Sequence, residues 1–255
     1  MQSPVHIERT VTTKLCTGFI LASTLCAADP PADLVKRAAL VEQANEEARA
    51  HYMYRQSVQI EEMDSRGVKA GDYRESREII FSPAGERTEK AIGEPWKALK
   101  RLQLTEEDSR DIREVQPLLL TPERLWIYER RFRGEEVVDG VDCWVLDVRP
   151  RQILDGQRLF EGLLWIEKET LATVRTEGRA VPQIYGRKNE NLFPRFTTIR
   201  EKVDGKHWFP VHTHGDDTLQ FRNGPLRMRL TIRYTNYKRF GAESTIKFEA
   251  PPSRP

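Results

Sequence analysis

The sequence predicts an α+β fold built on a single large curved antiparallel β-sheet, with one N-terminal amphipathic helix. Three observations lead to this prediction. Helical periodicity is confined to residues 34–50, and apolar and polar residues alternate with a period of two over most of the chain from residue 52 onward. Asp-Gly and Asn-Gly pairs separate several of the alternating segments, as expected for hairpins. About ten strands result, and a sheet of that size tends to curl.

The helix is predicted to run over 34–50. Asp33 precedes it and is a favourable N-cap residue, while charged residues such as Glu42 are expected to face solvent. The apolar positions that recur at helical spacing are Leu34, Ala38, Val41 and Ala48. This apolar stripe is modest and needs a surface to pack against.

The strands fall into two groups around a charged, non-alternating segment at 96–114, where we expect one or two short helices beginning near Thr105. Strands of the first group are predicted at 52–63, 73–81 and 87–92, with turns at 65–67 and 83–85. Those of the second group are predicted at 125–133, 135–138, 141–149, 162–166, 172–176, 196–203, 207–214 and 218–221. In the long last strand Leu226, Met228, Leu230, Ile232 and Tyr234 share one face, so one side of the sheet is apolar and the other wet. Residues 250–255 are predicted to be a frayed tail.

Residues 1–28 are predicted to be a secretory signal peptide. Arg9 and Lys14 precede a short apolar run at 15–25, and small residues follow up to a cleavage site near Ala28. Cleavage there leaves 29–255 as one domain in the periplasm. Lipid anchoring through Cys26 is a less favoured alternative because Leu25 precedes it, and an uncleaved N-terminus is another.

Composition excludes several classes of protein. The 41 basic and 39 acidic residues give a net charge of +2, which argues against nucleic acid as a partner. A mean hydropathy of −0.62 is too polar for repeated membrane spans. The common catalytic and nucleotide-binding motifs are missing from the sequence, so we expect neither enzymatic activity nor a cofactor.

The one cluster of potential metal ligands is weak. His212 and His214 project from the same strand face, and Asp216 continues the spacing. Histidines on a solvated strand beside a hairpin are the more ordinary interpretation, so no metal is expected.

An apolar concave face suggests a site for an acyl chain, because a lipid tail needs a water-excluded apolar pocket and little else. The candidate lining residues are Trp126, Tyr128, Trp144, Leu146, Leu164, Ile166, Met228, Leu230 and Ile232.

Several segments also match a known family in order. They are YMYRQ at 52–56, VDGVDCWVL at 138–146, FEGLLWIE at 160–167, VRTEG at 174–178, WFP at 208–210 and YTNYKRF at 234–240. With the signal and the helix, they make residues 34–249 resemble the outer-membrane lipoprotein-sorting-like proteins, the superfamily of the periplasmic carrier LolA and its receptor LolB. The resemblance implies an eleven-stranded unclosed half-barrel, helices acting as a lid, lipid acyl chains as ligands and no catalytic residues.

The sequence therefore predicts a monomeric, non-enzymatic periplasmic protein that binds lipid or lipoprotein acyl chains, in lipoprotein sorting or envelope maintenance, with envelope proteins as further partners. One alternative is a structural or interaction module whose core is solid. A less favoured one is an exported metal-binding hydrolase.

Overall fold

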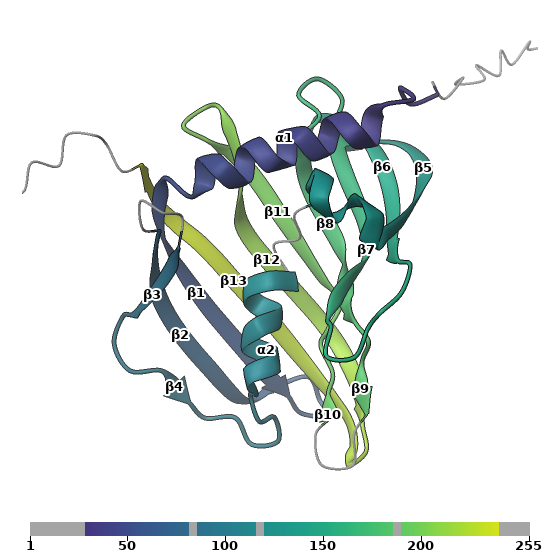
Figure 1. Cartoon of the computed structure of the whole chain (residues 1–255). Coiled ribbons are helices and arrows are strands. Elements are labelled where there is room, and N and C mark those ends of the chain that lie inside the picture. The colour runs from purple at the N-terminus through teal and green to yellow at the C-terminus, as the bar shows by residue number, and fades with distance from the viewer. Residues whose placement is uncertain (1–28, 82–85, 116–119, 186–189, 240–255) are drawn as a thin grey trace, which may run out of the picture.

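The computed structural model describes residues 29–81, 86–115, 120–185 and 190–239. The predicted signal at 1–28, the turn at 83–85 and the tail at 250–255 lie outside these ranges. An eleven-stranded antiparallel sheet has the order β3-β2-β1-β13-β12-β11-β8-β7-β6-β5, with β4 also pairing with β2 (Figure 1). Its strands are β1 (Tyr52–Met63), β2 (Lys69–Phe81), β3 (Arg87–Ala91), β4 (Trp96–Lys97), β5 (Tyr128–Val138), β6 (Val141–Pro150), β7 (Leu159–Glu167), β8 (Thr173–Val181), β11 (Phe196–Val203), β12 (His207–Phe221) and β13 (Gly224–Arg239).

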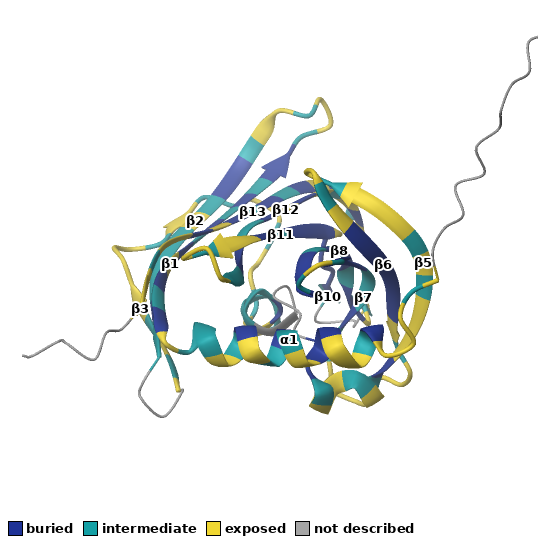
Figure 2. Ribbon diagram, turned by 90° about the horizontal axis from the view of Figure 1, so that it is seen from above, coloured by how far each residue is buried: buried dark blue, intermediate teal, exposed yellow. Residues whose placement is uncertain are grey.

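The remaining elements lie on or beside this sheet. They are α1 (Leu34–Arg49), α2 (Glu106–Arg110), the π-helical turn η1 (Asp111–Val115), the 3₁₀ helix η2 (Pro122–Ile127) and the small hairpin of β9 (Ile184–Tyr185) and β10 (Glu190–Asn191). Seen from above, the sheet curves around α2, and α1 runs across its open side (Figure 2). The predicted fold class, an unclosed curved antiparallel sheet with an N-terminal helix and short helices, is confirmed.

Helix α1 packs on the sheet through Leu34, Ala38 and Ala39, which are buried. Glu42 is buried as well, so the prediction that it faces solvent is wrong. Its carboxylate accepts a hydrogen bond of 2.5 Å from the Arg200 guanidinium of β11, and both side chains are 1% exposed. Asp33 precedes the helix without making a side-chain capping hydrogen bond.

Several strand boundaries differ from the prediction. The strand expected from 125 begins at Tyr128, because 122–127 form η2, and it continues past a bulge near Gly134 into the segment predicted separately at 135–138. The strands expected at 207–214 and 218–221 are one strand, β12. The sequence pattern missed β4 and the β9–β10 hairpin. Thr105 does begin a helix, with a capping box to Asp108.

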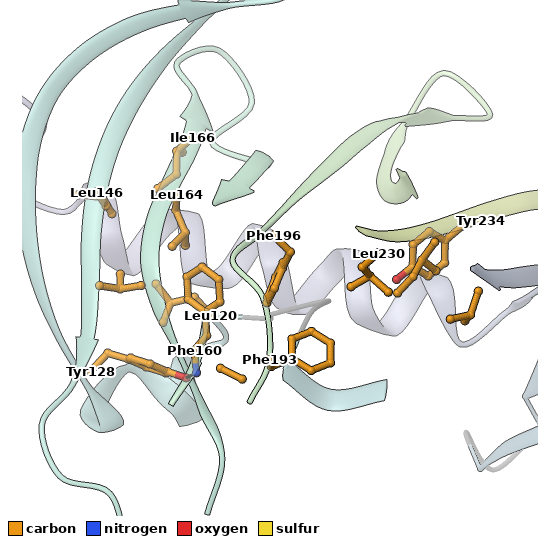
Figure 3. Close-up of a cluster of buried hydrophobic side chains, with 14 of the residues drawn as sticks. Leu120, Tyr128, Leu146, Phe160, Leu164, Ile166, Phe193, Phe196, Leu230 and Tyr234 are labelled. Carbon is orange, nitrogen blue, oxygen red and sulfur yellow. Dashed lines mark hydrogen bonds between the residues drawn. The ribbon is translucent and has the colours of Figure 1, made fainter. Parts of the chain in front are cut away.

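Most of the core lies on the concave face (Figure 3). Phe160 illustrates how tightly it is packed. Gly162 of β7 and Gly178 of β8 are paired in register, and a Cβ on Gly178 would lie 2.5 Å from the Phe160 ring. The ring therefore fits because both positions lack a side chain. A smaller cluster, Cys143, Val145, Trp165 and Val174, is built from the alternate positions of the same strands and covers the convex face.

Candidate ligand-binding site on the concave face

A pocket of about 300 Å³ lies on the concave face between the sheet and the segment that leads into α2. We call it the ligand pocket. Strands β1 and β13 form one wall, the segment at 101–105 faces them, and residues around β10 close the side. Its apolar lining consists of Ile60, Leu102, Leu104, Leu192, Phe193, Phe221, Leu226, Met228 and Leu230. The rest of its lining is polar or charged: Arg101, Gln103, Thr105, Asp108, Glu190, Asn191 and Asn223. A concave pocket that combines apolar side chains with polar groups is a candidate small-molecule site.

Glu62 of β1 fixes the segment that covers the pocket. Its carboxylate is buried and accepts the backbone N–H groups of Lys100, Arg101 and Leu102 at 2.7, 2.7 and 2.5 Å. Gly71 on β2 permits the approach, because a Cβ there would lie 2.6 Å from the Ala98 carbonyl oxygen. A buried carboxylate with three N–H donors is well satisfied, so this tether holds the rim of the ligand pocket against the sheet.

A buried polar cluster anchors the other end of the same segment. Asn191 of β10 donates to Thr105 Oγ1 at 3.0 Å and to Asp108 Oδ1 at 3.1 Å, joining the start of α2 to the hairpin. Arg158 donates to Asn191 Oδ1 at 2.8 Å and to Asp111 Oδ2 at 2.7 Å. Burial raises the pKa of Asp108, and it raises the pKa of Asp111 to about 7 although Arg158 favours the charged form. The cluster therefore fixes α2 inside the half-barrel.

The predicted lining residues divide into three groups. Met228 and Leu230 line the ligand pocket. Trp126 lies on η2 with 74% of its surface exposed, apart from the others. The rest are buried in the concave core, several of them visible in Figure 3: Tyr128, Trp144, Leu146, Leu164, Ile166 and Ile232.

The sequence prediction missed the residues that face the sheet across the pocket. Leu102 and Leu104 belong to the charged segment at 96–114, which has no strand period, and were not considered as lining. The spacing of Leu99, Leu102 and Leu104 among charged residues was the available signal. It was weak because a short irregular segment carries no repeat that identifies its buried face.

The candidate metal ligands do not converge on a third donor. The rings of His212 and His214 stack with centroids 5.2 Å apart. Asp216 instead accepts hydrogen bonds from Arg227 and Arg229 at 2.7 to 2.9 Å. Burial, together with His214 and Arg233, lowers the pKa of His212. Within the described ranges, no group of three or more His, Cys, Asp or Glu side chains is placed to hold a metal ion.

Comparisons with known proteins give similarities at the level of structure. No family model and no curated protein matches the chain, whereas solved structures do. A DUF1329-family protein from Desulfovibrio piger covers 85% of this chain and 98% of its own, at 16% identity and a TM-score of 0.37. A domain named for outer-membrane lipoprotein sorting, from Vibrio parahaemolyticus, covers 84% of this chain and 93% of its own, at 12% identity and a TM-score of 0.37. A LolA-superfamily protein from Nitrosomonas europaea covers 84% of this chain and 98% of its own, at 16% identity and a TM-score of 0.35.

The unclosed eleven-stranded sheet is the architecture that the resemblance of the sequence implies. Because the identities and TM-scores are low, the function proposed below rests on the geometry of this chain. Among the helices of the described residues, none is long and apolar enough to cross a membrane.

Proposed function

We propose that this protein is a non-enzymatic, periplasmic binding protein that takes up an acyl chain of a lipid or lipoprotein in the ligand pocket, in lipoprotein sorting or envelope maintenance. The observation that carries the proposal is the pocket itself, with apolar side chains of the sheet on one side and Leu102 and Leu104 on the other. The periplasmic location rests on the predicted signal at 1–28.

The size of the pocket suits a medium-length chain. A volume of about 300 Å³ holds about ten groups the size of a water molecule, each of about 30 Å³, and a methylene group is similar in size. At about 0.8 kcal/mol for each buried CH₂ group, complete burial of ten such groups contributes at most about 8 kcal/mol. That upper limit is enough for micromolar binding before the cost of ordering the chain is subtracted.

The cover of the pocket gives a route for entry. Leu104 is 37% exposed at the rim, and the segment at 99–105 is tied to the sheet by hydrogen bonds rather than by continuous strand pairing. Segments held by few buried apolar contacts open at lower free energy than the core strands. We propose that a ligand enters by displacing the part of this segment around Leu104, while Glu62 keeps residues 100–102 attached to the sheet.

The experiment is a titration with N-phenyl-1-naphthylamine, an uncharged probe that fluoresces in apolar sites, combined with native mass spectrometry of protein purified from a periplasmic extract. Leu104→Asp is the test variant, because it places a charge at the pocket wall. Val137→Asp on β5, 65% exposed, is the matched control. We expect the wild type and the control to bind equally, and Leu104→Asp to bind at least about tenfold more weakly.

A second candidate function is a structural or interaction module of the envelope. The tight packing of Phe160, Leu164 and Ile166, each 1% exposed, favours it, because much of the concave face is already filled by the chain's own side chains. If the wild type binds no probe and carries no lipid, the acyl-chain proposal is wrong and this module is favoured.

A further inference from the structure

A second cavity adjoins the ligand pocket. This outer cavity, of about 490 Å³, lies between the turn that joins β1 to β2 and the start of β13. Arg101 and Leu226 line both spaces, so the apolar pocket and the outer cavity meet at these two residues. Lys100 lines the outer cavity beside Arg101. Nine apolar side chains line the ligand pocket, whereas Lys100, Arg101 and Arg227 line the outer cavity, and an amphiphile requires apolar side chains for its tail beside charged ones for its headgroup.

The Arg101 guanidinium has neutral partners. It donates to Asn223 O, Asn223 Oδ1, Gly224 O and Pro225 O at 3.3, 3.1, 2.9 and 3.0 Å. Among the described residues, no carboxylate lies within ion-pair distance of Arg101 or Lys100, although ion pairs are common elsewhere on the sheet. Carbonyl oxygens hold the guanidinium in place without neutralising it.

The nearby carboxylates accept their hydrogen bonds from groups other than the side chains of Arg101 and Lys100. Glu62 accepts three backbone N–H groups, and Asp64 accepts the N–H groups of Arg66 and Val68 at 2.9 Å. In the ligand pocket, Asp108 accepts from Thr105 and Asn191, and Glu190 accepts the Arg222 N–H at 3.0 Å. The third cation of the outer cavity, Arg227, is paired with Asp216. Among the described residues, Arg101 and Lys100 are therefore the cations lining these two spaces that have no carboxylate partner.

We propose that Arg101 and Lys100 bind the anionic headgroup of an amphiphile whose tail occupies the ligand pocket. This inference rests on the proposed function and specifies its ligand class. A planar guanidinium matches the geometry of a carboxylate or a phosphate, and a lysine ammonium adds a second charge-assisted donor. The proposed ligand is an anion with a single acyl or alkyl tail. Its headgroup is either the carboxylate of a fatty acid or the phosphate of a monoester.

The experiment compares three twelve-carbon ligands, dodecanoate, dodecyl phosphate and dodecanol, as competitors of N-phenyl-1-naphthylamine below their micelle or solubility limits. We expect the wild type to bind at least one anion about tenfold more tightly than dodecanol. Arg101→Gln should weaken that anion by about tenfold and leave dodecanol unchanged, and Arg101→Lys should restore part of the loss. The tighter of the two anions identifies the carboxylate or the phosphate as the preferred headgroup.

Arg131→Gln is the matched control, since it removes the same charge from an exposed residue of β5 that lines neither the ligand pocket nor the outer cavity. It should leave all three affinities unchanged. Equal binding of the three ligands to the wild type, or an equal loss of all three in Arg101→Gln, overturns the headgroup assignment while leaving acyl-chain binding intact. Failure of all three ligands to bind the wild type contradicts the proposed function instead.

Discussion

The two halves of the concave face differ in how they are covered. Across β5 to β8 the sheet is filled by its own side chains, with Phe160 lying over the paired glycines Gly162 and Gly178. Across β1 and β13 the same alternation of apolar residues faces a segment held mainly through main-chain hydrogen bonds, and the ligand pocket remains between them. The strands of the two halves are alike in pattern. The difference lies in the cover, so the cover determines where a ligand fits.

The largest expected effect distinguishes the two halves directly. Phe160→Ala should lower the free energy of unfolding by about 3–5 kcal/mol, because it leaves a cavity in a packed region that glycines cannot fill. Met228→Ala, at the pocket wall, should cost about 2 kcal/mol, since the side chain already borders empty space. Urea denaturation of the two variants measures both values. Equal losses would contradict the distinction between a filled half and a hollow half.

Helix α1 closes the open side of both halves, and its ion pair with β11 can be tested next. Glu42→Gln should destabilise the fold by about 3 kcal/mol, because it removes the charge opposite the buried Arg200. The double variant Glu42→Met with Arg200→Met should recover most of this loss, since two apolar side chains need no charge partner. Thermal unfolding of both variants provides the measurement. If the double variant is no more stable than the single one, the loss in Glu42→Gln does not come from leaving the buried Arg200 without its charge partner.

Asp111 gives a pH-dependent test of the cluster between the two halves. Burial raises its pKa from an ordinary value of 3.8 to about 7. Between pH 4 and 7 the unfolded chain loses this proton while the folded chain keeps it, so stability falls as pH rises, by at most about 1.4 kcal/mol per pH unit. Asp111→Asn, which keeps an acceptor for Arg158, should remove this part of the slope. Parallel profiles of the wild type and the variant from urea denaturation would contradict the raised pKa.

The smallest effect is expected outside both halves. Trp126→Ala should change the free energy of unfolding by less than about 0.5 kcal/mol, because the side chain is 74% exposed on η2. Probe affinity should also be unchanged. A clear loss of affinity, measured by the same fluorescence titration, would place Trp126 at the ligand and extend the site beyond the pocket described above.

Much of the fold could be predicted from alternation and turn residues. The last strand shows why: Met228, Leu230 and Ile232 share a face in any antiparallel sheet, whatever their partners. Strand ends were less predictable. Leu125, Trp126 and Ile127 are as apolar as a strand, yet Pro122 at the first helical position favours the 3₁₀ helix that precedes β5.

The site was less predictable than the fold, because it depends on contacts distant in sequence. Glu42 is a charged residue of a kind usually exposed on a helix. It is buried here because Arg200, far along the chain, forms an ion pair with it. Leu102 and Leu104 line the ligand pocket because Glu62 holds their segment over β1. Neither partnership leaves a local periodicity. Composition and pattern therefore predicted an apolar concave face, whereas the residues at the rim of the ligand pocket could be identified only from the structure.

The tether made by Glu62 has a consequence for how the binding specificity of this protein can change. Its three hydrogen bonds go to main-chain N–H groups, which every residue type except proline supplies. The side chains at 100, 101 and 102 can therefore be exchanged without detaching the segment. A library randomised at these three positions, with Glu62 and Gly71 kept, should yield folded proteins that differ in ligand preference. In such a scaffold, the side chains that contact a ligand can change while the main-chain hydrogen bonds that hold their segment stay the same.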